Sequence, residues 1–521
     1  MHGRSNRMRI AVLFALPVVV LLTTYALGQP PAEPKTFSTA SSEMRYLGSA
    51  YCSLCHTQPQ PQLKNSLQHV WLNEFTTWSK TDKHSLAFKN LKEERGLAMT
   101  RRLGKDVLKA ETGCLGCHSA SVAEVMYSST DKKQGDAFNR ADGVSCENCH
   151  GPGEKWLGEH AISWWRTKSP AHKAELGMND LRSPSIQAEK CLSCHIGNSD
   201  EKKVVTHAMY AAGHPPLPSI EVATFGDQIP RHWRTLQEKR DNGKNNPDYD
   251  PKAVENHFAY EGDQLERSKL AVVSAAIALK TSMALLAKES NSSAAKPNHE
   301  DVPGLGWPDY ARFDCTSCHH ELERPSWRQD RGFTSAPGRP PVVRWPSFVA
   351  ALGVEKLATD DPKAKLLLEE MKAHEAAIDD ATRAKPFGRS EDMGAAAAKY
   401  AAWADRLAQK LESSKFDGKL VTAILQRLVQ EASETDLDYD AARHVGWTIW
   451  AFRSDLGKNL KNGEEVDRIL VRISSELRLQ LPTGRDKSIE KQLSDALRTM
   501  GEYKPIAFRE DLKSLAPLLA P

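Results

Sequence analysis

Over most of its length the sequence lacks the features of a nucleic-acid-binding, membrane-spanning or β-sheet protein. Its 521 residues include 70 basic and 67 acidic side chains. No block of basic residues gathers in one place, which argues against a nucleic-acid partner. No alternation of apolar and polar residues reaches the length of a strand. Beyond residue 28, no apolar stretch approaches the length needed to cross a bilayer.

The N-terminal segment is the exception to this pattern. Arg4, Arg7 and Arg9 precede the apolar stretch IAVLFALPVVVLLTTYALG, and no acidic residue lies among them. A cationic start, an apolar stretch and a small-residue cleavage site, here ALG, are typical of a secretory signal peptide. We therefore expect residues 1–28 to be a signal peptide and the mature protein to be periplasmic. If this segment stays uncleaved, it anchors the protein in the membrane.

The cysteines have an unusual spacing for an exported protein. All ten belong to five Cys-x-x-Cys-His motifs: CSLCH, CLGCH, CENCH, CLSCH and CTSCH. Two thiols at this spacing can form thioethers with the two vinyl groups of one haem, and the adjacent histidine then reaches the iron. The predicted attachment residues are Cys52, Cys55, Cys114, Cys117, Cys146, Cys149, Cys191, Cys194, Cys315 and Cys318. The predicted proximal iron ligands are His56, His118, His150, His195 and His319.

Other uses of cysteine explain this pattern less well. Disulfides do not require a histidine after every pair. Zinc sites need two Cys-x-x-Cys arms that converge on one metal, so an odd number of arms would leave one unused. Thioredoxin-like pairs occur singly, beside a strand-helix unit that is absent from this sequence. The sequence therefore predicts five covalently bound haem c groups.

The order of these features predicts the domain organisation. Residues 29–46 are rich in Pro, Ser and Thr and are expected to be a linker. Residues 47–346 carry all five motifs on short helices and loops, and are expected to form a pentahaem cytochrome c domain. Residues 347–521 contain no cysteine and show apolar faces at helical spacing, so a helical domain with its own core is expected there. The predicted fold class is mainly α: a loop-rich multihaem domain followed by an α-helical bundle.

The sixth ligand of each iron decides between electron transfer and catalysis. A second imidazole gives a low-spin electron-transfer centre, whereas an open position can bind a small molecule. Spacing alone does not pair histidines with irons. The available histidines in the haem region are His69, His84, His160, His172, His207, His214, His232, His257, His299 and His320.

One segment resembles a known family. GVSCENCHGPG, with His160 ten residues after the histidine of CENCH, is similar to the central signature of the cytochrome c-554 family of multihaem cytochromes. The segment from Trp78 to His84 is similar to that family's as well. The four motifs from Cys52 to His195 match its tetrahaem arrangement.

The resemblance implies specific ligands. It implies that His160 completes the iron held by His56, and that His84 completes the iron held by His150. In that family the haem that corresponds to the one on His118 can lack a protein sixth ligand.

The segment VVTHAMYAAGHPPL resembles a motif of larger bacterial relatives, which makes His207 and His214 plausible ligands, one of them for His195. The fifth motif and the helical region lie outside the family's tetrahaem pattern. The sixth ligand of the iron on His319 stays open, with His257 and His299 as candidates, whereas His320 directly follows the proximal ligand and cannot easily reach the opposite haem face.

These inferences favour an electron carrier that exchanges electrons with periplasmic redox proteins. The alternative is an oxidoreductase that acts on a small nitrogen or sulfur compound at a five-coordinate haem, with the haem of His118 as its site. Against this alternative, no Cys-x-x-Cys-Lys motif marks a lysine-ligated catalytic haem.

Overall fold

The structure is a computed structural model. It describes residues 44–519 apart from 61–69, 110–111, 120–137, 236–237, 240, 242–263, 293–301, 303–305, 321, 323, 325–337, 344, 384, 458–461 and 480–488. The expected signal peptide and most of the expected linker therefore lie outside the described residues. So do three of the candidate ligands, His69, His257 and His299.

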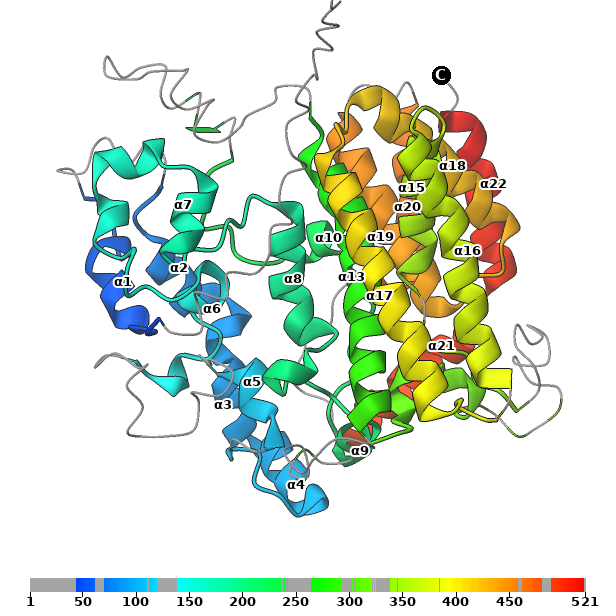
Figure 1. The fold of residues 1–521 in the computed structure, drawn as a ribbon, viewed down its shortest axis with the longest axis horizontal. Helices are drawn as coiled ribbons and strands as arrows, with labels where there is room; N and C mark the ends of the chain where they lie inside the picture. Colours follow the sequence, from blue (N-terminus) through cyan, green and yellow to red (C-terminus); the bar gives the residue numbers. More distant parts are fainter. Residues whose placement is uncertain are drawn as a thin grey trace, which may run out of the picture. The chain divides into compact units, whose positions relative to one another are not determined.

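The predicted fold class is confirmed. The described residues form helices and loops, and isolated β-bridges pair Asn198 with Lys203 and Phe313 with Val342. The N-terminal part is rich in loops and short helices, and the C-terminal part consists of long helices (Figure 1).

Four of the five Cys-x-x-Cys-His motifs end a short helix with their histidine. These helices are α1 (Ser49–His56), α5 (Cys114–His118), α6 (Cys146–His150) and α8 (Pro184–His195). The fifth motif begins in a 3₁₀ turn, η11 (Cys315–Ser317), and the backbone N–H of His319 donates to the carbonyl of Cys315 at 2.8 Å. One helical turn thus brings the two thiols and the histidine of each motif to neighbouring positions.

The other elements of the haem region are equally short. They are α2 (Glu74–Thr81), η3 (Lys83–Leu86), α3 (Ala87–Lys92), α4 (Glu94–Leu103), η5 (Arg140–Asp142), η6 (Glu159–Ala161), η7 (Ser163–Thr167), α7 (Pro170–Glu175), η8 (Ser199–Glu201), α9 (His207–Ala212), α10 (Val222–Gly226) and η10 (Tyr310–Arg312).

A helical bundle follows. Its helices are α15 (Ser347–Ala358), α16 (Pro362–Arg383), α17 (Ser390–Ser413), α18 (Gly418–Glu434), α19 (Tyr439–Leu456), α20 (Gly463–Glu476), α21 (Ile489–Glu502) and α22 (Pro505–Leu515), with η13 (Ala516–Leu519) at the end. Acidic side chains start several of them. For example, the carboxylate of Asp417 accepts from the backbone N–H of Leu420 at 2.9 Å at the start of α18. The apolar faces of α18 and α20 are buried, so they form the core of the bundle, as expected.

Helix α13 (Glu266–Ser292) connects the two parts. It packs against α8 of the haem region and against α15, α17 and α19 of the bundle (Figure 1). Within the described residues, one helix, Glu266–Asn291, is apolar and long enough to cross a membrane, which corrects the expectation that no such stretch follows residue 28. The protein buries 72% of that helix's apolar window, as in the core helix of a soluble protein.

All described residues fall into one compact unit. One continuous apolar core includes Leu192 of α8, Leu279 of α13 and Leu407 of α17. The predicted boundary between residues 346 and 347 remains a prediction, but the packing of α13 joins the two predicted domains through this core.

Candidate metal centres

The first centre is built from α1 and from the segment after α6. The rings of His56 and His160 are stacked, with centroids 6.1 Å apart and an interplanar angle of 12°. His56 Nδ1 lies 2.8 Å from the carboxylate of Glu74, and His160 Nδ1 lies 2.5 Å from the carbonyl of Leu157. With both Nδ1 atoms engaged, the Nε2 atoms are left for a metal between the rings. The sequence resemblance implied this pairing.

The second centre lies between His118 and His214. Their ring centroids are 6.3 Å apart and the rings are nearly perpendicular, at 87°. His118 Nδ1 lies 3.0 Å from the carbonyl of Ala87, and His214 Nδ1 lies 2.7 Å from the carbonyl of Pro215. The resemblance implied that the iron held by His118 can lack a protein sixth ligand. The structure instead brings His214 to that position. His214 faces His118 rather than His195, the other position considered for it.

The centre of the fourth motif pairs His84 with His195. Their ring centroids are 6.5 Å apart, at 84°. This differs from the implied pairing of His84 with His150. The backbone carbonyl of His84 is held beside the third motif, since it accepts from the N–H of Val144 at 3.0 Å, while its ring faces the fourth motif. Asp82 fixes that ring, because its carboxylate lies 2.9 Å from His84 Nδ1.

The fifth centre pairs His207 with His319. Their rings are stacked, with centroids 6.1 Å apart at 27°. His207 begins helix α9, and its backbone N–H donates to Asp309 at 2.9 Å. Its imidazole is nearly perpendicular to the Tyr310 ring, and the two ring centroids lie 5.5 Å apart. The expectation that His207 or His214 serves His195 thus differs from the structure, in which His207 lies opposite the histidine of the fifth motif.

These four pairs fit a metal bound on the line between two imidazoles. With about 2 Å from the metal to each nitrogen, such ligands place their ring centroids roughly 6 Å apart. Burial keeps several of the rings in the neutral form that binds metals, since it lowers the pKa of His195 and of His214 to about 4. Each centre also carries the two cysteines of a motif, and none of the ten cysteines forms a disulfide. The residues therefore fit covalently attached haem.

The attachment cysteines of different motifs are close together. The thiols of Cys52 and Cys146 are close enough to shift each other's pKa, and so are those of Cys117 and Cys194. Cys149 and Cys194 also interact electrostatically. Motifs one and three, three and four, and four and two are thus adjacent, although they are separated along the chain.

Some positioning residues were not identified from the sequence. Glu74 and Asp82 hold the rings of His56 and His84 through Nδ1. Asp82 also accepts from the backbone N–H of His84 at 2.9 Å, so it starts the η3 turn as an Asp at a helix start commonly does. The position of Asp82 at a helix start can be recognised in the sequence. The contact of Glu74 with a histidine 18 positions earlier cannot, because it depends on tertiary structure.

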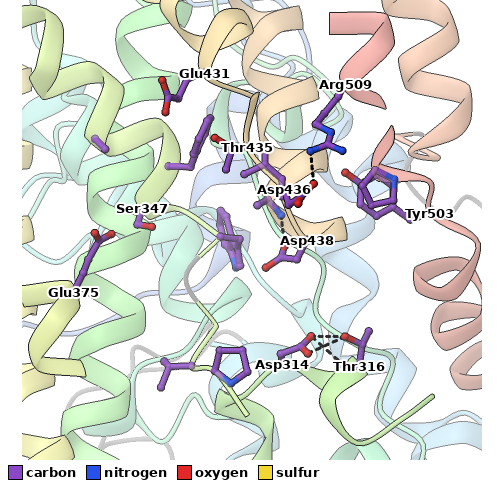
Figure 2. A pocket seen from close by; sticks show the side chains of 18 of the residues that line it. Asp314, Thr316, Ser347, Glu375, Glu431, Thr435, Asp436, Asp438, Tyr503 and Arg509 are labelled. Carbon is purple, nitrogen blue, oxygen red and sulfur yellow. Dashed lines mark hydrogen bonds and ion pairs between the residues drawn. The ribbon is translucent and has the colours of Figure 1, made fainter. Parts of the chain in front are cut away.

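A cavity of about 1660 Å³ lies beside the fifth motif, between it and the bundle. Asp314 and Thr316 form one side of it, and Asp436, Asp438 and Arg509 lie across from them (Figure 2). The Asp314 carboxylate accepts from the Thr316 and Ser317 hydroxyls at 2.7 to 2.9 Å, which fixes the turn between the two cysteines. The described residues that line the cavity include none of the ligand histidines.

Two histidines, His374 in α16 and His444 in α19, lie in the bundle. His444 is fully buried, its ring packs 4.7 Å from that of Trp345, and burial lowers its pKa to about 3. His374 stacks on Tyr400 at 5.6 Å.

Comparison with known proteins supports the interpretation of the N-terminal part. Residues 51–151 match the family described as Cytochrome c554 and c-prime. The matched segment contains the first three attachment motifs. No curated protein and no solved structure matches the chain. The family match supports a c-type cytochrome with covalently bound haem c and a role in electron transfer.

Proposed function

We propose that this chain is an exported multihaem c-type cytochrome that transfers electrons through five covalently bound haem c groups. The family match over residues 51–151 supports its c-type character. The number five rests on the five Cys-x-x-Cys-His motifs, two of which lie beyond the matched segment.

The observation that carries the proposal is the second imidazole opposite four of the attachment histidines. When bound, a haem iron with two imidazole ligands supplies a low-spin centre that exchanges one electron and has no free position for a substrate. His160, His214, His84 and His207 occupy these positions at ring separations of 6.1 to 6.5 Å. This ligand set favours electron transfer over catalysis.

The remaining residues of the centres fix these ligands. Glu74 and Asp82 accept from ring nitrogens, and backbone carbonyls do so at other rings, such as that of Ala87 at His118. Such partners set the tautomer and orientation of a ligand histidine and raise its basicity. The adjacent thiols of Cys52 and Cys146 bring two attachment sites together, which is the proximity that electron transfer between haems requires.

The alternative function, an oxidoreductase acting at an open haem of His118, has less support. The ring of His214 lies 6.3 Å from that of His118, on the side a substrate would have to use. A low-spin centre is the better expectation there.

The cellular location and the partners belong to the same proposal. Haem is attached to Cys-x-x-Cys-His motifs outside the cytoplasm, and residues 1–28 have the composition of a secretory signal. We therefore place the mature protein in the periplasm, where it exchanges electrons with redox proteins. Membrane attachment is expected only if residues 1–28 are retained.

Haem content and spin state test this proposal. The purified protein is expected to contain five haems per chain by mass and by pyridine haemochrome absorbance. Its electron paramagnetic resonance spectrum is expected to show low-spin ferric signals, and reduction by dithionite is expected to be reversible. Fewer than five haems would overturn the pentahaem assignment. A high-spin haem that turns over nitrite or hydroxylamine would overturn the electron-carrier assignment.

A further inference from the structure

Helix α9 carries the second histidine of two different centres. His207 is its first residue and faces His319 of the fifth motif, with ring centroids 6.1 Å apart. His214 follows the end of the helix and faces His118 of the second motif, with ring centroids 6.3 Å apart. An α-helix advances about 1.5 Å per residue, so the backbones of His207 and His214 lie about 10 Å apart. One short helix thus holds both the second and the fifth centre.

The C-terminal end of α9 belongs to the surroundings of the second motif. Gly213 ends the helix with a φ of 118°, a conformation that favours glycine. The backbone N–H of His214 then donates to the carbonyl of Met209 at 2.9 Å, which fixes where the histidine leaves the helix. Arg102 of α4 donates to the carbonyl of Ala212 at 3.1 Å. Helix α4 also packs against α3, and α3 packs against α5 of the second motif.

The N-terminal end of α9 is attached to the segment that leads into the fifth motif. Asp309 accepts from the backbone N–H of His207 at 2.9 Å, and Arg312 donates to the carbonyl of Val205 at 2.7 Å. Arg312 also lies 2.8 Å from the buried carboxylate of Glu289 in α13. The acceptor and the arginine both lie within six positions of the first cysteine of the fifth motif. The two ends of α9 are therefore fixed to two different motifs.

Tyr210 lies between the two ligand histidines of α9 in sequence. Its ring centroid is 6.0 Å from that of His214, and its hydroxyl accepts from the backbone N–H of Leu217 at 3.5 Å. Tyr210 and Cys114 of the second motif pack against the same small apolar core, which includes Met209. Packed side chains therefore join α9 to the second attachment site.

We propose that electrons pass directly between the second and the fifth haem, and that α9 sets their separation by supplying the second axial ligand of both irons. The step moves one electron from a ferrous to a ferric iron and neither forms nor breaks a bond. This inference rests on the proposed function, because it requires a haem on each of the two motifs. It adds the fifth haem, which lies outside the family match, to the row of adjacent motifs one, three, four and two.

Nitric oxide, used as a spin probe on the full-length protein with its haems attached, tests which haems are neighbours. In the reduced protein a haem iron with two imidazole ligands is diamagnetic, whereas an opened ferrous haem binds one nitric oxide and gains one unpaired spin. His207→Ala is expected to open the fifth haem and His214→Ala the second. Each variant should bind one nitric oxide per chain more than the wild type does. A variant that binds no additional nitric oxide would overturn the inference.

The double variant His207→Ala/His214→Ala measures the proximity of the two haems. Its electron paramagnetic resonance spectrum is expected to be broader than the sum of the two single-variant spectra, because dipolar coupling between spins rises steeply at short distance. An unbroadened spectrum would overturn the inference.

Two matched double variants are the controls. His207→Ala/His84→Ala opens the fifth and the fourth haem, which are the competing neighbours because residues 196–206 connect the fourth motif to α9. Its spectrum should be less broadened than that of His207→Ala/His214→Ala, and the reverse order would overturn the inference. His207→Ala/His160→Ala opens the fifth and the first haem. It should give the sum of its single variants, since α1 of the first motif packs against α2 and α6.

Glycine variants keep the test decisive if an alanine variant loses haem. His207→Gly and His214→Gly can be produced in imidazole, which fills the open position and is removed by dialysis before nitric oxide is added. A wild type with fewer than five haems would contradict the proposed function. Five haems together with an unbroadened second-fifth double variant would contradict this inference alone.

Discussion

At the scale of single residues, buried carboxylates connect segments that are far apart in the sequence. Glu147, inside the third motif, is 3% exposed and accepts from the backbone N–H groups of Leu47, Gly48 and Gly153 at 3.0, 2.8 and 2.6 Å. It thereby joins the start of the first attachment helix to the loop after the third. Hydrogen bonds to a charged acceptor are stronger than neutral ones.

Replacing this carboxylate should therefore destabilise the protein. In Glu147→Gln one of the two acceptor oxygens becomes an NH₂ group that faces a backbone donor, so we expect a loss of about 2 kcal/mol in the free energy of unfolding. Denaturant titration followed by tryptophan fluorescence measures this loss. Glu154→Gln, which alters the exposed pair with Arg45, is the control and should change stability much less. Equal effects of the two substitutions would contradict the argument.

A second buried carboxylate predicts a dependence of stability on pH. Glu289 of α13 is 1% exposed and lies 2.8 Å from Arg312 Nε. Burial and the nearby Asp309 raise the pKa of Glu289 from 4.5 to about 7, although Arg312 opposes the shift. Between these two values the folded chain retains a proton that the unfolded chain has released. The stabilisation from this group is therefore complete below pH 4.5 and is lost as the pH rises through 7.

The matching experiment compares wild type with Glu289→Gln. A shift of this size corresponds to roughly 3 kcal/mol across the interval, so the wild type should lose more stability between pH 4.5 and 7.5 than the variant does. Denaturation midpoints at several pH values give both slopes. If the two slopes agree, Glu289 is ionised in the folded protein throughout and the raised pKa is wrong.

At the scale of helices, a close contact between α13 and α15 depends on one glycine. A Cβ atom at Gly353 would lie 2.4 Å from Val272 Cγ1 and 3.3 Å from Leu411 Cδ2. In an exposed helix, replacing glycine by alanine stabilises by about 1 kcal/mol. In this contact the added methyl group forces α13 and α15 apart.

Gly353→Ala is therefore expected to destabilise the protein by roughly 1 to 3 kcal/mol, the opposite sign from the helix preference. Gly418→Ala provides the comparison, because nothing lies within 4 Å of a Cβ atom at the first residue of α18. That variant should be neutral. Thermal melting of both variants measures the two changes in stability. A stabilised Gly353→Ala variant would show that the contact between α13 and α15 is looser than described.

The helices also show what the sequence could predict. The attachment motifs and the bundle faces depend on local spacing, so their helices were correctly expected from residues a few positions apart. The pairing of ligands depends on tertiary contacts, and there the resemblance implied His160 with His56 as observed, but not His84 with His195 or His207 with His319. No local pattern distinguishes these pairings, because each joins segments that only folding brings together.

At the scale of the whole molecule, the disappearance of cysteine after the fifth motif suggested two domains. Composition marks where the haem sites end, but it does not show which helices share a core. Helix α13 lies before residue 346 in the sequence, yet its apolar residues Val272, Ile277 and Met283 are at most 1% exposed within a core shared with α17. Separating the chain at residue 346 would expose this face to water.

This packing predicts that the two parts stay associated after the chain is cut. A protease site inserted between Pro346 and Ser347 should allow cleavage into two fragments that co-elute on size-exclusion chromatography, because burial of the α13 face contributes about 25 cal/mol per Å² of apolar area. The two fragments should separate only in denaturant. A second variant that also carries Gly353→Ala should dissociate at a lower denaturant concentration, since it weakens the contact with Val272. Fragments that separate without denaturant would instead establish two independent domains with the boundary expected from the sequence.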